Sequence, residues 1–180
     1  MLKSEQYKSD VVHSVAEFSV RHMMIATVKG RFTKVEVEYS GDGDDFEGGD
    51  VTVKIDLNSV ETFDENRNNH LRSDDFFSVK NYPFMTFVSK EIKKEGDNEY
   101  SVTGNLTIRN VTKEITVKVE HEGKIKDPYG NMRIGVSAYG ELIREDFGLK
   151  WNSIMETGGV LVGSKVKFEV HSELVQLPEQ

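Results

Sequence analysis

The 180-residue sequence contains no cysteine, which excludes a disulfide framework, catalysis by a thiol and zinc sites built on cysteine. It also has no run near the ~20 consecutive apolar residues that a membrane-spanning helix needs. Residues 1–8 are mostly polar, and no apolar stretch of the kind found in secretory signals follows their charges. We therefore expect a cytoplasmic protein without integral membrane contact.

Basic residues are scarce relative to acidic ones. The chain has 23 Lys and Arg against 31 Asp and Glu, which gives a formal net charge of -8. Binding to nucleic-acid phosphates needs clustered Lys and Arg, and so does attraction to an anionic membrane surface. The net charge therefore argues against both partners and favours a soluble protein.

Apolar and polar residues alternate along most of the chain, which is typical of half-buried strands. Ala16, Phe18, Val20 and His22, for example, share one face of their segment. Residues 23–30 break this alternation and are interpreted as a crossing or a helical turn. The pattern predicts eight strands, at residues 13–22, 32–39, 51–57, 84–92, 100–108, 115–119, 132–142 and 166–174.

A longer break in the alternation covers residues 58–83. Its centre, residues 66–72, is too polar for a buried strand, and Asp64 and Glu65 supply the negative charge favoured where a helix begins. We expect a short helix here, with Pro83 ending the segment before the next strand. Its apolar members are expected to cover one end of the β structure; they are Phe63, Leu71, Phe76 and Phe77.

These elements predict an all-β fold, an eight-stranded antiparallel barrel with a helical insertion between the third and fourth strands, spanning residues 1–180 as one domain. A two-sheet sandwich is the main alternative. The barrel is favoured because several strands are long and closure leaves no exposed sheet edge. Eight strands enclose an interior that side chains fill or that holds one small ligand. The inward residues are mostly apolar, so any ligand is expected to be apolar.

No catalytic residue, metal site or cofactor is predicted. The five histidines lack the spacing of metal ligands, and the acidic residues 42–50 do not match a calcium-binding loop. Residues 158–165 mimic a phosphate loop, but a strand pattern follows instead of a helix. His22 and His121 fall in phase with apolar faces, so each either binds the polar end of a ligand or is a core histidine with a hydrogen-bonded neighbour.

Several short motifs follow one another between residues 11 and 175. They are H-S-x3-F-x-V-x-H-x-M at 13–24, V-x-G-x-F at 28–32, N-x2-N-H-L-R-S-x2-F-F at 66–77, Y-P-x3-F at 82–87, G-x-L-T-I-x2-V-T-K at 104–113, D-P-Y-G at 127–130, F-G-L-x-W-N at 147–152 and G-G-V-L-V-G at 158–163. In this order and spacing, the chain resembles the YceI family of bacterial, lipocalin-like, polyisoprenoid-binding proteins.

The resemblance implies a lipocalin-like barrel with a long apolar tunnel, a bound isoprenoid or similar fatty-chain lipid, and often a homodimer. It supplies no catalytic residue and no cofactor. Asn69 stands where the family pattern often has Asp. The implied function is a non-catalytic carrier or sequestering protein for a long-chain amphiphilic lipid.

Strand phase gives candidate ligand-binding residues for this function. Those expected to line the tunnel are Phe18, Val20, Phe87, Leu106, Val117, Val136 and Phe168. Those expected at its mouth are Leu71, Phe76, Phe77 and Trp151. His22 and Arg72 are the polar groups expected to hold the lipid's head.

Two other functions stay open at this point. The first is an enzyme acting on a lipid or quinone-like substrate inside the barrel, for which His22 or His121 would supply the titratable group. The second is a filled barrel that serves as a stress-response interaction module. A filled barrel would contain no cavity.

Overall fold

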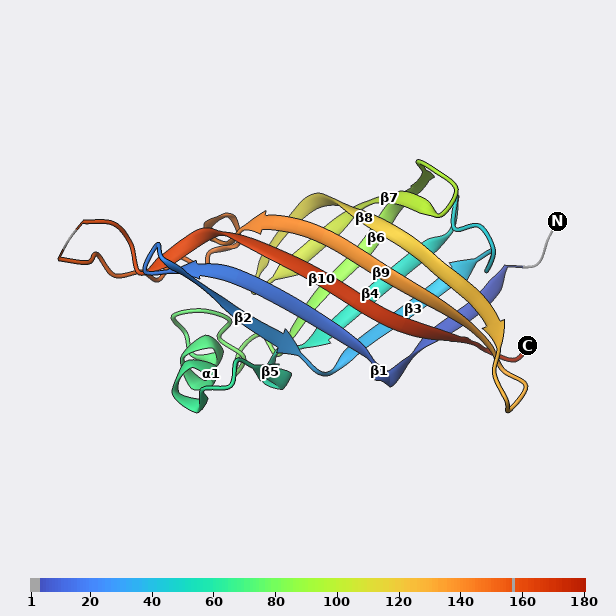
Figure 1. Ribbon diagram of the computed structural model, residues 1–180, viewed down its shortest axis with the longest axis horizontal. Coiled ribbons are helices and arrows are strands. Elements are labelled where there is room, and N and C mark those ends of the chain that lie inside the picture. Colours follow the sequence, from blue (N-terminus) through green and yellow to red (C-terminus); the bar gives the residue numbers. More distant parts are fainter. Residues whose placement is uncertain (1–3, 157) are drawn as a thin grey trace.

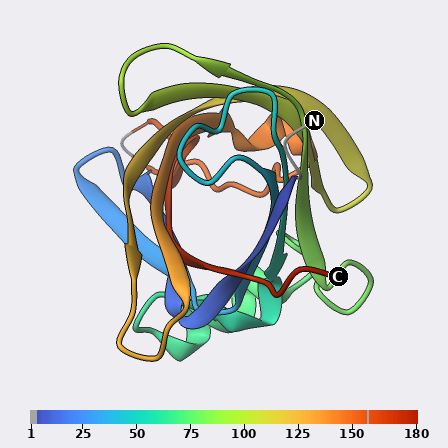
Figure 2. The ribbon, with the colours of Figure 1, turned by 90° about the vertical axis from the view of Figure 1, so that its right-hand side faces the viewer.

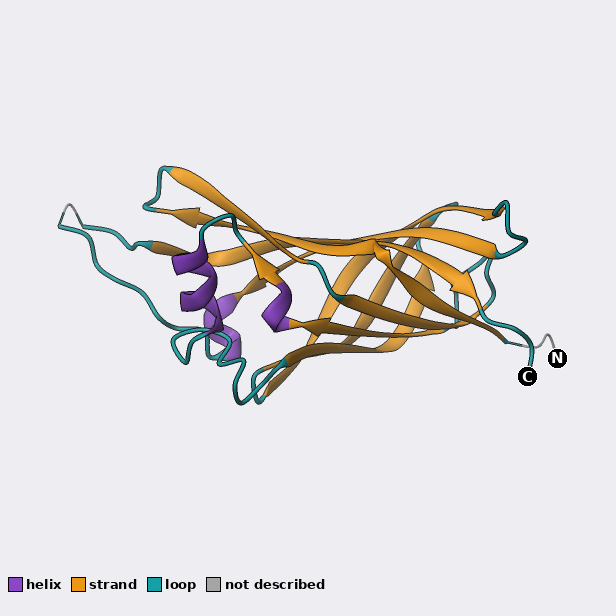
Figure 3. Cartoon of the chain, turned by 90° about the horizontal axis from the view of Figure 1, so that it is seen from below, coloured by secondary structure: helices purple, strands orange, loops and turns teal. Residues whose placement is uncertain are grey.

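The computed structural model describes residues 4–156 and 158–180, so the first three residues of the polar N-terminal segment lie outside the described residues. The described chain forms an elongated barrel, with helix α1 at one end and both chain ends at the other (Figures 1 and 3). The helices are α1 (Glu65–Arg72) and the 3-10 helices η1 (Leu57–Ser59) and η2 (Arg144–Phe147). The strands are β1 (Glu5–His22), β2 (Ala26–Phe32), β3 (Val35–Gly41), β4 (Asp50–Asp56), β5 (Val60–Glu61), β6 (Phe84–Lys94), β7 (Glu99–Ile108), β8 (Val111–Lys126), β9 (Met132–Ile143) and β10 (Val162–Gln176).

Eight of these strands close into a barrel in which all neighbours are antiparallel. Their order is β1, β3, β4, β6, β7, β8, β9 and β10, and β10 then pairs with β1. This last pairing runs from Tyr7–Gln176 to His22–Val162 and joins the first strand to the last. The barrel prediction is confirmed and the sandwich alternative is wrong, as the view along the barrel shows (Figure 2).

The prediction for residues 23–30 is wrong. The segment is not a crossing or a helical turn, because only residues 23–25 turn and β2 then runs back antiparallel to β1, from His22–Ala26 to Ala16–Phe32. The inward positions of β2 include Gly30, which has no side chain to mark the alternation. β1 also begins earlier than predicted, at Glu5, because a register shift after Ser9 interrupts its pattern.

The insertion between β4 and β6 contains the predicted helix. Asp64 caps α1 by accepting a hydrogen bond from the Arg67 N–H (3.0 Å), which satisfies one of the free donors at the helix start. Among the described residues, no helix is long and apolar enough to cross a membrane. Phe63 does not join the apolar cap as predicted, because it is 75% exposed with the Arg31 guanidinium over its ring.

An ion cluster links three strands on the outer wall of the barrel. Arg133 on β9 donates from Nε to Asp127 Oδ2 (2.7 Å), and its Nη1 lies 2.9 Å from Asp10 Oδ2 on β1 and 3.3 Å from Glu173 Oε2 on β10. The hydrogen bond from Arg133 is the largest influence on both aspartates, and it helps to lower the pKa of Asp10 and of Asp127 to about 2. The cluster therefore stabilises the fold only while these carboxylates are charged.

We expect Arg133→Gln to reduce the free energy of unfolding at pH 7 and to have a smaller effect near pH 2. The folded-state pKa of both aspartates is lower than the usual value of ~4. Their contribution is therefore present above about pH 4 and is lost as the pH falls toward about 2. Urea unfolding of both proteins at each pH measures the difference.

The matched control is Lys90→Gln, which breaks one exposed pair with Glu114 (2.7 Å between Nζ and Oε2). Isolated surface pairs contribute little to stability, so this change should have almost no effect at either pH. An Arg133→Gln effect of equal size at both pH values would contradict the assignment of stability to the charged cluster.

Candidate ligand-binding cavity

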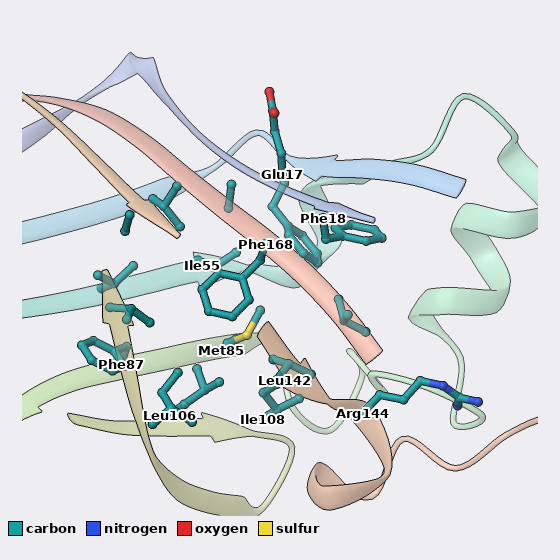
Figure 4. Close-up of a pocket in the computed structure, with 18 of the residues that line it drawn as sticks. Glu17, Phe18, Ile55, Met85, Phe87, Leu106, Ile108, Leu142, Arg144 and Phe168 are labelled. Atoms are coloured by element: carbon teal, nitrogen blue, oxygen red, sulfur yellow. The ribbon is translucent and has the colours of Figure 1, made fainter. Parts of the chain in front are cut away.

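The barrel encloses a cavity of about 370 Å³ whose lining is almost entirely apolar. Phe18, Phe87 and Phe168 lie among the lining side chains in Figure 4, whereas the carboxylate of Glu17 points away from them. The three phenylalanines and the inward-facing Val136 are only half-buried although the barrel wall surrounds them. Side chains of a close-packed core would be fully buried. The interior is therefore hollow, which argues against the filled-barrel alternative.

All of the predicted ligand-binding residues except Arg72 line the cavity. Whether they contact a ligand stays a prediction, but the common location of those on strands follows from the correct strand phase. Those in the lining are Phe18, Val20, His22, Leu71, Phe76, Phe77, Phe87, Leu106, Val117, Val136, Trp151 and Phe168.

Arg72 does not belong to the lining, so its role at the lipid's head stays a prediction that the cavity does not support. Its Nη2 donates to the carbonyl of Asn58 (3.2 Å), and its Nη1 donates to Asn69 Oδ1 (3.1 Å). His70 and Leu71, which precede it on the same helix, both belong to the lining. The guanidinium instead ties α1 to the segment that precedes it.

The ring ends of three aromatic side chains in the lining contact glycines of neighbouring strands. At each of these glycines, a methyl group would overlap the end of the ring. The pairs are Phe18 with Gly30, Phe168 with Gly140, and Phe87 with Gly104. The absence of a side chain at each glycine therefore leaves the space that the ring end occupies.

The end of the barrel near both termini is closed by aromatic rings. Phe46 lies at the centre of this plug, with its ring centroid 5.0 Å from Tyr39, 5.2 Å from Tyr100 and 4.6 Å from His121. Tyr7 extends the group, 6.0 Å from Tyr39. Offset and edge-on ring contacts of this kind are favourable beyond the area that they bury.

Hydrogen bonds fix the acidic loop, residues 42–49, over this plug (Figure 2, cyan). The Tyr39 hydroxyl donates to the Asp42 carbonyl (2.9 Å), and the Tyr100 hydroxyl donates to Asp45 Oδ1 (3.0 Å). His121 Nε2 lies 2.8 Å from the Gly43 carbonyl, to which it donates. His121 is thus a core histidine with a hydrogen-bonded partner, and the acidic loop is a lid fastened to the barrel.

The opposite end, near α1, carries the mouth. The lining there continues to His22 at the end of β1 and to Leu161 and Val162 at the start of β10, all only partly buried, so the cavity extends to this end of the barrel. His70 on α1 packs edge-on against Trp151 (4.5 Å between centroids), and its Nε2 pairs with Asp75 at 2.8 Å. Sequence analysis missed His70 as a mouth residue, although it directly precedes Leu71 in a recognised motif.

A buried arginine shapes the mouth from the other side. Arg144, only 3% exposed, donates to the backbone carbonyls of Leu149 (2.7 Å), Gly163 (2.7 Å) and Trp151 (2.9 Å). Burial lowers its pKa from the usual value. These bonds position Trp151 beside α1. Strand periodicity offered no signal for Arg144, since it follows the last residue of β9.

Two mixed clusters of histidine and carboxylate could hold a metal ion, and both involve the outer wall. Their members are Asp10, His13 and Glu173 in one, and Glu17, Glu169 and His171 in the other, with ligand atoms within 4.8 Å of one another. Arg133 already binds two members of the first cluster. Linear spacing could not reveal either cluster, because each combines residues of β1 with residues of β10.

The geometry can now be compared with known proteins. Residues 7–174 match the family model of the YceI-like domain. The chain belongs to this family. A UPF0312 protein of Staphylococcus epidermidis is 40% identical over 169 residues, covering 93% of this chain and 96% of that protein. A UPF0312 protein of Staphylococcus aureus is 40% identical over 165 residues, covering 91% and 94% of the two chains.

Solved structures of other proteins share the barrel. BcnA of Burkholderia cenocepacia has a TM-score of 0.79 at 25% identity, covering 92% of this chain and 98% of that one. A YceI protein of Campylobacter jejuni has a TM-score of 0.74 at 31% identity, covering 88% and 90%. A polyisoprenoid binding domain from Saccharophagus degradans has a TM-score of 0.70 at 18% identity, covering 95% and 98%. This last likeness concerns the fold alone.

The seating of aromatic rings on glycine predicts the effect of Gly140→Ala in this YceI-like barrel. The added methyl group would force the Phe168 ring off the wall and into the cavity. The displaced ring would occupy space that a ligand needs, so binding of the apolar dye N-phenyl-1-naphthylamine should weaken roughly fivefold or more, which corresponds to ~1 kcal/mol of binding free energy. Fluorescence titration measures the affinity of the dye.

Gly135→Ala is the matched control on the same strand. Its methyl group would lie 3.4 Å from Glu122 Cβ, an ordinary contact, so dye binding should stay unchanged. Equal effects of the two substitutions on dye affinity would show that ring seating does not control the space in the cavity.

Proposed function

We propose that this YceI-like protein is a non-catalytic carrier that binds one long-chain isoprenoid or similar amphiphilic lipid in its barrel. The observation that carries the proposal is the hollow apolar interior, closed at one end of the barrel and extending to the other. A cavity of about 370 Å³ lies within the range of pockets that hold one small ligand. The fold shared with a polyisoprenoid binding domain supports an isoprenoid as the ligand class.

Apolar burial would supply the affinity. Each methylene group removed from water contributes about 0.8 kcal/mol, so a segment of about ten carbons contributes roughly 8 kcal/mol. Association itself costs ~4 kcal/mol or more. A short chain would barely offset this cost, whereas a long one leaves a clear surplus, which favours long-chain ligands.

The polar end of the lipid belongs at the mouth. At the far end of the cavity, the plug hydroxyls of Tyr39 and Tyr100 already donate to the acidic loop. At the mouth, the lining includes His22, Arg67 and His70. Arg67 is held in place because its Nη2 donates to the Thr62 carbonyl (2.6 Å). We therefore retain His22 as a head-group contact and put Arg67 in the place first given to Arg72.

Binding is favoured over catalysis by the positions of the two histidines on which an enzyme would depend. His121 donates to a backbone carbonyl and stacks on Phe46 within the plug. His22 lies at the mouth, away from the centre of the cavity. General acid–base chemistry needs a titratable group within hydrogen-bond reach of the reacting atoms, and the apolar lining of the lumen suits an unreactive chain.

Native mass spectrometry of the purified protein, followed by solvent extraction and lipid identification, tests the proposal directly. We expect a stoichiometric adduct that yields an isoprenoid or fatty chain on extraction. A bare mass that stays unchanged after incubation with prenols, quinones and fatty acids would overturn it.

Filling the cavity gives a genetic test. Val136 on β9 faces the hollow interior, so Val136→Phe should abolish the lipid adduct with little loss of stability, because the larger side chain enters open space. Urea unfolding and native mass spectrometry measure the two effects.

The control is Ile143→Phe, at an exposed position of the same strand, which should leave the adduct intact. In a filled core, Val136→Phe would instead cost ~1–3 kcal/mol of stability. That result, with the adduct retained, would be incompatible with a lipid in the lumen.

A further inference from the structure

The turn between β1 and β2 exposes three consecutive apolar side chains. Met24 is 60% exposed and Ile25 is 79% exposed, and Met23 precedes them. Met23 and Met24 have φ values of 53° and 61°, in the left-handed region that Gly and Asn occupy more readily. A hairpin turn that served only to reverse the chain would favour Asn-Gly here. The sequence instead places bulky apolar groups at a projecting tip.

A second apolar tip lies beside the first. The Met23 N–H donates to the Leu161 carbonyl (2.8 Å), and Met24 Sδ lies against Gly159. This neighbouring loop exposes Ile154 to 84%. Both tips project beyond the barrel at the end that carries α1 (Figures 1 and 3). We call their exposed apolar side chains the rim patch, which consists of Met23, Met24, Ile25, Ile154 and Val160.

The rim patch adjoins the mouth of the cavity. His22 directly precedes the first tip, Leu161 follows Val160 in the second, and both residues line the cavity. Anything that covers the rim patch would therefore also meet the opening.

Two segments at opposite ends of the barrel differ in charge, although the second tip carries Glu156, and Lys94 and Lys124 pair with the acidic loop. Residues 18–35, which contain the first tip, include Arg21, Lys29, Arg31 and Lys34 and no acidic residue. The acidic loop over the plug and the residue after it, 42–50, contain five acidic residues and no basic one. The net charge of -8, which argues against an anionic surface as partner, thus conceals a basic hairpin at the mouth end.

We propose that the rim patch inserts into the surface of a bilayer that contains anionic lipids, with the mouth facing the membrane. Apolar side chains would enter the acyl boundary while the basic residues of the hairpin meet the lipid head groups, the two features that interfacial membrane binding combines. Docking to the bilayer does not depend on the proposed carrier function. Exchange of a lipid between the cavity and the bilayer at this site does rest on that function.

A second copy of the chain fits the rim patch less well. A stable dimer buries about 800 Å² on each partner, over a complementary surface. The rim patch consists of five side chains on two projecting tips, a shape suited to insertion into a soft surface. Its basic surroundings would also repel the same surroundings on another copy.

Co-flotation with vesicles tests the docking. We compare vesicles of phosphatidylcholine alone with vesicles containing equal amounts of phosphatidylcholine and phosphatidylglycerol. Wild-type protein is expected to float with the anionic vesicles, and added salt should weaken this binding. Ile25→Asp should reduce the binding roughly tenfold or more, since burial of one large apolar side chain contributes ~1.5–3 kcal/mol.

Ile125→Asp is the matched control, because Ile125 is a 67% exposed isoleucine near the end of β8, in the half of the barrel that carries the termini. It should bind vesicles like wild type. Ile154→Asp, on the second tip, provides an independent variant if Ile25→Asp fails to fold, and circular dichroism checks folding. Wild-type protein that ignores anionic vesicles, or equal losses in Ile25→Asp and Ile125→Asp, would overturn the proposal.

Two further measurements separate this proposal from its alternatives. If sedimentation shows that Ile25→Asp converts a dimer to a monomer and no form binds vesicles, the rim patch is an interface between copies and the proposal fails. Native mass spectrometry without vesicles tests the carrier function alone. Vesicle binding by a protein that never carries lipid would support docking and reject the proposed function.

Discussion

Closure of the barrel by the pairing of β1 with β10 is the constraint on which the rest of the structure depends. It fixes a ring of eight strands, a size at which inward side chains either just fill the interior or leave room for one ligand. Small differences in the lining then decide between these outcomes. Gly30, Gly104 and Gly140 leave the space that the ends of large rings occupy, and the interior stays apolar and yet hollow.

The two ends of the barrel are built by different means, and this difference gives the cavity a direction. The closed end uses aromatic stacking and hydrogen bonds from Tyr39, Tyr100 and His121 to fasten a loop over the opening. The open end uses α1 and the segment that Arg144 holds through backbone carbonyls. A bound chain would therefore lie with its apolar tail toward the plug and its polar end at the mouth.

Much of this arrangement could be predicted from the sequence because the alternation of a strand is local. Once Phe18 and Val20 are in phase with an apolar face, the pleat alone directs them inward. Features that depend on distant strands carried no such signal. The plug joins residues as far apart in the sequence as Tyr7 and His121, and each outer-wall cluster joins β1 to β10. β2 was missed because Gly30 lacks a side chain, and the placement of Arg72 at the lipid's head rested on charge alone, which could not reveal its hydrogen bond to the Asn58 carbonyl.

The net charge of the whole chain does not describe the charge at one end of the barrel. A net charge of -8 describes the whole chain, whereas a surface responds to what lies within about a Debye length, ~8–10 Å in salt. The acidic loop sits at the plugged end, a barrel length from the basic hairpin at the mouth. An anionic surface would therefore attract the mouth end and repel the plugged end. Such a surface would orient the molecule as well as bind it. In the described part of the chain the plug covers the other end, so the end favoured by charge is also the end by which a lipid would enter under the proposed function.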